Sequence, residues 1–267
     1  MILALQYYNG DRAQAFKLAQ LLADLEPRYR DDVVLALVCQ PDTTIDEVTE
    51  EVLLHCRERF PTTHVVSKYG AQGWADGSGQ LWRGVMTHFS KLRREHLIPD
   101  ASIFTFDGGD GVPLHCNWID LMVEQHEITR SRGKMVSGTL CLDVPAHPNI
   151  NGNMILDFEL WEKYPSLHDT PLGASTAEWW KTWDTYHAPV FIANASPSSI
   201  VCNHWNRRGV NEAILRATSA ESIWLHGYKD TNFCDVVRSY LLGYQEGKAT
   251  RPLIRRTIYD LGAPVLS

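Results

Sequence analysis

Short apolar runs alternate with amphipathic segments through the first 110 residues, and this alternation restricts the fold more than any other feature of the chain. Residues 2–7 and 33–39 are apolar almost throughout, which is typical of strands covered on both faces. Segments that begin at Asp11 and Thr44 carry apolar side chains at helical spacing. The same order continues with a strand at 64–67, a helix at 80–95 and a strand that ends at Asp107. The pattern predicts an α/β fold with a mostly parallel central sheet, helices on both faces and a nucleotide-binding N-terminal half.

The second half of the chain is less regular. It predicts helices at 118–126, 175–186, 210–217 and 233–244, and strands at 135–142, 198–203 and 222–225. A capping box that begins at Ser175 opens the second of these helices. Three tryptophans on that helix either stack against a ligand or build core: Trp179, Trp180 and Trp183. We expect one domain over 1–267, with a nucleotide-binding half at 1–114, a second half at 115–246 and a basic tail at 247–267.

Composition excludes several classes of protein. The six cysteines are scattered without a Cys-x-x-Cys pair, so neither a zinc knuckle nor a disulfide framework is indicated. The net charge of −7 does not favour a nucleic-acid-binding protein as a whole. No apolar run is long enough to cross a bilayer, and the first residues lack the basic segment of a signal peptide. We therefore expect a soluble, cytoplasmic protein with no membrane partner.

Two aspartates stand where an apolar strand ends. Asp107 and Asp110 follow residues 102–106 and are separated by Gly108 and Gly109. Ligands of open α/β folds bind at the carboxyl ends of the strands, and Mg²⁺ or Mn²⁺ prefers carboxylate oxygens together with phosphate oxygens. The glycines, with Gly111, would let a diphosphate approach the backbone. The alternative is an ordinary Asp-Gly turn.

Four segments resemble those of GT-A glycosyltransferases, the enzymes that move a sugar from a nucleotide-sugar donor, and the likeness covers most of the chain. The segments are 107–114 followed by 118–120, 68–74 followed by 79–82, 148–153, and 225–230. The family usually spaces its metal-binding acids Asp-x-Asp, whereas this chain has Asp107-x-x-Asp110. Alignment on Pro113 puts Asp110 at the second acidic position and Gly108 at the first. Either Asp107 reaches the metal or ribose through a changed turn, or one contact is lost.

The resemblance implies a role for most of the candidate residues. It implies that Mn²⁺ or Mg²⁺ is held by Asp107, Asp110 and His226, and that Lys229 contacts a phosphate. It places Lys68, Trp74 and Gln80 at the donor. Tyr8, Asn9 and Asp42 are placed at the nucleoside only by their position at the ends of the first two strands, where a nucleoside normally lies. On the sugar and acceptor side the resemblance implies roles for Asn151, Asn153 and Asp184. Asp184 would contact the donor sugar or the acceptor hydroxyl and could be the general base of an inverting transfer. The alternative for Asp184 is a solvated helix acid, and retention of configuration is left open.

We therefore expect a metal-dependent hexosyl- or pentosyltransferase that uses a nucleoside-diphosphate sugar and a hydroxyl acceptor. A nucleotidyltransferase would need a glycine-rich basic loop after the first strand, and residues 7–11 do not form one. The altered acidic spacing leaves open a non-catalytic nucleotide- or sugar-binding module of the same fold. A viral-type enzyme acting on hydroxymethylated bases in DNA is a further alternative. Basic clusters at 91–94, 130–134, 207–208 and in the tail could bind its phosphates, although solvated helix faces also explain them.

Overall fold

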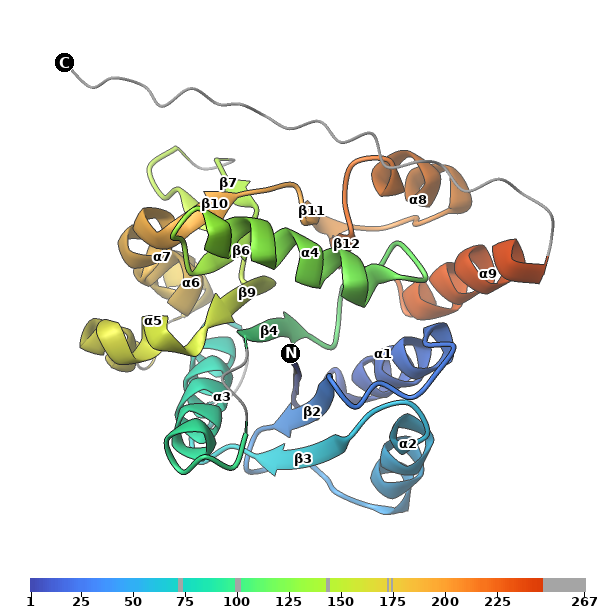
Figure 1. Cartoon of the computed structure of the whole chain (residues 1–267), viewed down its shortest axis with the longest axis horizontal. Coiled ribbons are helices and arrows are strands. Elements are labelled where there is room, and N and C mark those ends of the chain that lie inside the picture. Colours follow the sequence, from blue (N-terminus) through green and yellow to red (C-terminus); the bar gives the residue numbers. More distant parts are fainter. Residues whose placement is uncertain (72–73, 99–101, 143–144, 172, 174, 247–267) are drawn as a thin grey trace.

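A seven-stranded sheet forms the centre of the molecule in the computed structural model, which describes residues 1–71, 74–98, 102–142, 145–171, 173 and 175–246 (Figure 1). The predicted basic tail lies outside these residues. The strand order is β10-β6-β9-β4-β1-β2-β3. The strands are β1 (Ile2–Tyr7), β2 (Val34–Cys39), β3 (Thr62–Val66), β4 (Ser102–Asp107), β6 (Val136–Gly138), β9 (Met154–Asp157) and β10 (Ala195–Pro197). All pairs are parallel except those of β9, which runs antiparallel to β4 and β6. The mostly parallel sheet is thus confirmed, whereas the antiparallel β9 was not predicted.

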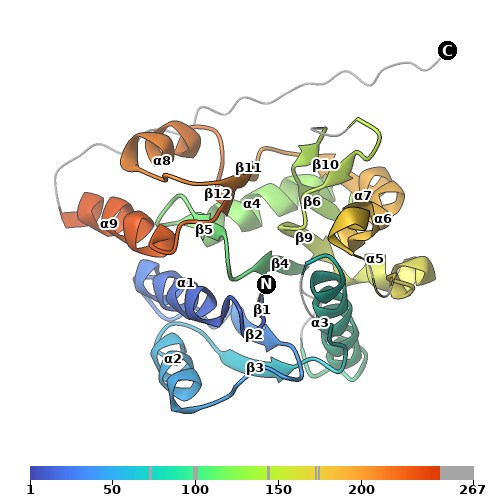
Figure 2. The ribbon, with the colours of Figure 1, turned by 180° about the vertical axis from the view of Figure 1, so that it is seen from behind.

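Helices cover both faces of this sheet, as the sequence predicts (Figures 1 and 2). One core lies beneath α1 (Arg12–Leu25), α2 (Glu47–Arg57), α4 (Trp118–Ser131), α8 (Glu212–Ser219) and α9 (Phe233–Glu246). The other lies beneath α3 (Asp76–Arg94), α5 (Phe158–Lys163), α6 (Trp183–Tyr186) and α7 (Ala188–Asn194). Leu3 and Leu5 point into the first core, and Ile2 and Ala4 into the second. Because each face of β1 is buried, its sequence is apolar throughout.

A second, three-stranded sheet links the two halves of the chain. It contains β5 (Gly111–Pro113), β11 (Val201–Arg207) and β12 (Trp224–Tyr228), in the order β11-β12-β5. β12 runs antiparallel to β5, with His226 opposite Gly111. The short β7 (Leu140–Cys141) and β8 (Asn149–Ile150) pair separately, and the 3₁₀ turns are η1 (Pro165–His168) and η2 (Thr176–Lys181). Because β12 pairs with β5, the second sheet brings His226 next to the acidic turn after β4.

The bounds of several predicted elements differ from the structure; the helix predicted at 80–95, for example, is α3 and begins at Asp76. α2 begins at Glu47 instead of Thr44, because the side chain of Asp46 accepts a hydrogen bond from Thr49 N in a capping box. The predicted helix at 175–186 is the 3₁₀ turn η2 followed by α6, and Ser175 makes no side-chain cap. The predicted strand at 135–142 is divided into β6 and β7. The errors fall where local capping or a change of pairing partner decides the boundary.

A buried polar network ties β9 to α4. His126 lies 2.7 Å from Ser137 Oγ through Nδ1 and 3.0 Å from Asp157 Oδ1 through Nε2. The residue types are those of a hydrolytic triad, but Ser137 is fully buried and His126 is 2% exposed, so no substrate reaches them. The network therefore anchors α4 on β6 and β9.

The described cysteines are all free, in agreement with the absence of a predicted disulfide framework. Across the described part of the chain, no helix is both long and apolar enough to cross a bilayer.

The glycines of the acidic turn allow close packing, a role that was not predicted from the sequence. A Cβ at Gly108 would lie 2.4 Å from Ala15 Cβ on α1, and one at Gly111 would lie 2.6 Å from Trp224 Nε1. Of Gly108, Gly109 and Gly111, only Gly109 lines the cleft at the carboxyl ends of β1 and β4.

Gly108→Ala is expected to lower the free energy of unfolding by about 1–3 kcal/mol, because α1 must move away from β4. Gly243→Ala is the control, since a Cβ there meets no atom within 4 Å. In a helix that change should stabilise the protein by about 0.5–1 kcal/mol. Urea unfolding of both variants measures the contrast, and equal stabilities would contradict the packing role of Gly108.

Candidate active site

A cleft of about 690 Å³ opens at the carboxyl ends of β1 and β4. Its lining comes from both halves of the chain: Gln6, Tyr7, Tyr8, Gly10, Asp11, Gln14, Gln40, Trp74, Gly77, Ser78, Leu81, Asp107, Gly109, Asp110, Cys141, His147, Asn149, Asn151, Gly152, Asn153, Trp179, Thr182, Trp183, Asp184, Thr185, Asn203, Trp205, Asn206, His226, Lys229, Asp230 and Thr231. This is the edge of the sheet where the sequence predicts ligand binding.

Asp107, Asp110 and His226 converge in this cleft. One potential ligand atom from each lies within 4.8 Å of the other two, and His226 Nε2 is 3.3 Å from Asp110 Oδ1. Gly227 N donates a hydrogen bond to the carbonyl oxygen of Asp110 (2.8 Å), so β12 is held directly against the acidic turn. Two carboxylates and an imidazole suit a divalent cation such as Mn²⁺ or Mg²⁺. The Asp-x-x-Asp spacing therefore keeps both carboxylates in one cluster.

The charges in the cluster are strongly coupled. Burial raises the pKa of Asp107 to about 6, and the neighbouring charge of Asp110 adds to the increase. Burial also acts to raise the pKa of Asp110, but His226 and an ion pair with Lys229 outweigh it and hold that pKa well below its usual value. Burial opposes protonation of His226, yet the adjacent Asp110 raises the pKa of the imidazole. Asp110 is thus the ionised centre of the cluster.

A row of amides and one carboxylate forms the wall next to the cluster. Asp184 accepts hydrogen bonds from Asn149 Nδ2 (3.1 Å) and Thr185 N (3.0 Å), and burial raises its pKa. Asn151 Oδ1 accepts from the backbone N (2.9 Å) and Nδ2 (3.0 Å) of Asn153. Asn153 Oδ1 is buried and has no hydrogen-bond partner among the described residues. This wall offers a fixed carboxylate and an unoccupied acceptor atom.

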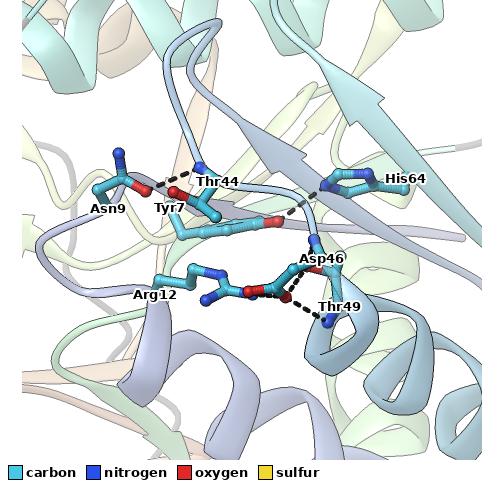
Figure 3. A network of polar contacts seen from close by, with 7 residues as sticks. All are labelled: Tyr7, Asn9, Arg12, Thr44, Asp46, Thr49 and His64. Carbon is cyan, nitrogen blue, oxygen red and sulfur yellow. Dashed lines mark hydrogen bonds and ion pairs between the residues drawn. The ribbon is translucent and has the colours of Figure 1, made fainter.

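Asn9, one of the residues predicted at the nucleoside, belongs to a network of polar contacts between the end of β1 and the loop before α2 (Figure 3). Asn9 Nδ2 donates to the carbonyl oxygen of Asp42 (2.9 Å), and Asn9 Oδ1 accepts from Thr44 N (2.8 Å). In the same network Tyr7 Oη lies 2.8 Å from His64 Nε2, and Arg12 forms an ion pair with Asp46.

Only one of the three predicted nucleoside residues borders the cleft. Tyr8 lines it and is 40% exposed, whereas Asn9 and Asp42 are not among the described lining residues. Both the Nδ2 and the Oδ1 of Asn9 form hydrogen bonds within the protein, so Asn9 positions the loop before α2.

The predicted donor-facing residues divide in the same way. Trp74 lines the cleft with an exposed indole. Lys68 is exposed and Gln80 is buried, with Gln80 Nε2 donating to Asp76 Oδ1 (3.4 Å), and neither is among the described residues that line the cleft. Residues 72–73 of the same predicted loop lie outside the described residues.

The three tryptophans of residues 175–186 also have different roles. Trp183 is 5% exposed and stacks on Trp82 with ring centroids 4.4 Å apart, so most of its indole is in the core. Trp179 lines the cleft beside His147. Trp180 stacks on His147 but is not among the described lining residues.

Sequence reasoning missed several cleft residues, of which Asp11 and Trp205 stand out. Asp11 stands at the start of a predicted helix, where an aspartate is typical of a cap, but its carboxylate accepts a hydrogen bond from Tyr8 N (2.9 Å) and makes no side-chain cap to α1. Burial raises the pKa of Asp11 to about 7, with Asp107 and Asp110 contributing. No local pattern distinguishes such an acid from a helix cap. Trp205 lies on β11 in a run of polar residues, and nothing in its spacing predicts exposure in a cleft.

Comparison with solved structures identifies the fold. The galactosyltransferase LgtC, solved with donor and acceptor sugar analogues, matches 94% of this chain and 98% of its own at 9% identity, with a TM-score of 0.50. The mannosyltransferase PcManGT from Pyrobaculum calidifontis, solved with GDP-Man and Mn²⁺, matches 94% of this chain and 66% of its own at 13% identity, with a TM-score of 0.46. No protein-family model and no curated protein matches the sequence. The chain has the GT-A glycosyltransferase fold, as the sequence predicts.

Proposed function

We propose that this protein is a metal-dependent glycosyltransferase that moves a hexosyl or pentosyl group from a nucleoside-diphosphate sugar to a hydroxyl acceptor. The observation that carries the proposal is the convergence of Asp107, Asp110 and His226 in the cleft of a GT-A fold. Departure of a nucleoside diphosphate builds negative charge on its oxygens, and a site that gathers metal ligands next to a lysine suits that charge.

The cluster and Lys229 would both stabilise the negative charge of the donor diphosphate. Asp107, Asp110 and His226 would hold Mn²⁺ or Mg²⁺, and the bound ion supplies Lewis-acid stabilisation of the diphosphate. Lys229 lies against Asp110 and adds a flexible positive charge on the same side of the cleft. Tyr8, whose side chain is partly exposed at the end of β1, is available to contact the nucleoside.

Asp184 is the proposed general base. In a single displacement, the acceptor oxygen forms a bond to the sugar's anomeric carbon while the bond from that carbon to the diphosphate oxygen breaks. The diphosphate takes the bonding electron pair, and the acceptor's proton passes to the Asp184 carboxylate. A raised pKa makes this carboxylate a better base, and Asn149 fixes its orientation.

Nucleotide binding that depends on a metal tests the proposal. We expect UDP, GDP, CDP or ADP at about 100 times its dissociation constant, with Mn²⁺, to stabilise the protein by about 2.7 kcal/mol. In a chain of this size that raises the melting temperature by several degrees, with roughly 2–4 °C for each kcal/mol.

Excess EDTA should remove the effect, and differential scanning fluorimetry measures both changes. Failure of all four nucleotides to stabilise the protein in the presence of Mn²⁺ or Mg²⁺ would contradict the proposed function. Stabilisation without any turnover of nucleotide sugars would instead support the non-catalytic binding module.

A further inference from the structure

Two exposed indoles meet at the cleft. Trp74, in the loop before α3, is 44% exposed, and Trp205, on β11, is 61% exposed. Their ring centroids are 6.0 Å apart with an interplanar angle of 45°, and both line the cleft. Exposed aromatic surface beside a concave site marks a binding surface, because apolar area left in water is otherwise unfavourable.

The backbone holds Trp205 next to the metal-ligand cluster. Gly227 has a φ of +100°, and a Cβ at this residue would lie 2.7 Å from both His204 C and Trp205 N. β12 therefore approaches β11 more closely than any other residue type would allow. Asn203, also on β11, lies 3.0 Å from His226 Nδ1 through its Oδ1. The indole is thus carried on a strand that also contacts the cluster.

The charge of the cleft excludes a polyanion as the partner of these indoles. Among the described residues that line it there are five aspartates, one lysine and no arginine. The lysine, Lys229, is ion-paired with Asp110 and is already assigned to the donor diphosphate. Proteins bind DNA or RNA by neutralising phosphates with several lysines or arginines, so the lining is unsuited to a nucleic acid.

The polar groups of the cleft suit a neutral ligand rich in hydroxyls. Five asparagines line it: Asn149, Asn151, Asn153, Asn203 and Asn206. An amide both donates and accepts, which matches a hydroxyl group. The buried Oδ1 of Asn153 has no partner among the described residues and can accept from such a hydroxyl. A pyranose ring combines a rim of hydroxyls with a face of C–H groups, and those C–H groups pack on the electron-rich face of an indole.

We infer that the acceptor is a neutral saccharide whose pyranose ring packs against Trp74 and Trp205. The inference rests on the proposed function, because it names the acceptor of that reaction. It assigns the exposed indoles of Trp74 and Trp205 to a sugar. It rejects the hydroxymethylated base in DNA, which the sequence left open as an acceptor.

Saturation-transfer NMR with methyl glycosides of glucose, galactose and mannose tests the inference. The experiment uses the full chain with Mg²⁺, with and without the nucleoside diphosphate that stabilises it. We expect at least one glycoside to receive saturation at its ring protons. Trp205→Ala and Trp74→Ala should each reduce that signal at least fivefold, whereas Trp205→Tyr, which keeps an aromatic face, should retain part of it.

Trp180→Ala is the matched control, because Trp180 is 39% exposed but is not among the described residues that line the cleft. It should leave the signal unchanged, and melting curves show whether each variant is folded. Nucleotide binding without saturation of any glycoside would overturn the inference and leave the proposed function intact. Glycoside binding that needs Trp205, without nucleotide binding, would support the saccharide site and contradict the proposed function.

Binding to DNA is measured separately, because a hydroxymethylated base would also present a flat ring to the indoles. An oligonucleotide that contains 5-hydroxymethylcytosine should bind no more tightly than its unmodified counterpart in fluorescence anisotropy. Preferential binding that is lost in Trp205→Ala would overturn the inference in favour of a base acceptor.

Discussion

Asp110→Ala is expected to reduce donor turnover by about three powers of ten and to remove metal-dependent nucleotide binding. Asp110 is the carboxylate with the lowered pKa, and it contacts both His226 and Lys229. Its loss would remove one of the proposed metal ligands and leave His226 and Lys229 without their common partner. A bound metal contributes several kcal/mol to stabilising a leaving group, and each 1.36 kcal/mol is about tenfold in rate.

Calorimetric titration of a nucleoside diphosphate with Mn²⁺, followed by a donor-hydrolysis assay, measures both effects. Asp110→Asn keeps the shape of the side chain and separates loss of charge from misfolding. Asp31→Ala, an exposed residue in the turn before β2, is the control and should behave as the wild type. Full turnover by Asp110→Ala, or by the wild type in excess chelator, would contradict the metal site.

The fold was predictable where burial is written into local sequence. β1 and β2 are apolar on both faces because both are covered, and α1 shows its buried stripe through Ala15, Leu18 and Leu22. β9 could not be predicted, because it has only four residues and follows an Asn-Gly pair, which is typical of a turn. Its place between β4 and β6 is set by pairing partners that are distant in the sequence.

The location of the candidate site was predictable from two signals, the ends of the strands and the family resemblance. The end of β4 locates Asp107 and Asp110 without any knowledge of the rest of the chain. His226 and Lys229 came from the resemblance, and β5, which brings them there, is only three residues long. Asn9 shows the limit of this reasoning. Its position at the end of β1 was correct, but the partners of its amide are decided by how the loop before α2 folds back.

Asp184→Asn is expected to reduce sugar transfer by about 10²–10⁴-fold, the usual contribution of a general base. The substitution keeps the size of the side chain, and the remaining Oδ1 can still accept from Thr185 N, whereas the new Nδ2 can no longer accept from Asn149 Nδ2. It removes the charge and the proton-accepting oxygen, which act mainly in the transition state. Nucleotide affinity should therefore stay within about twofold of the wild type.

The comparison of transfer with nucleotide binding distinguishes a base from a structural acid. A matched control is Asp230→Asn, because Asp230 also lines the cleft but accepts from Gly209 N and Val210 N in a loop contact. It should alter transfer far less than Asp184→Asn does. Equal losses of transfer and of nucleotide affinity in Asp184→Asn would show that the carboxylate supports the donor site instead. Unchanged transfer would remove Asp184 from the chemistry and contradict its role as the general base.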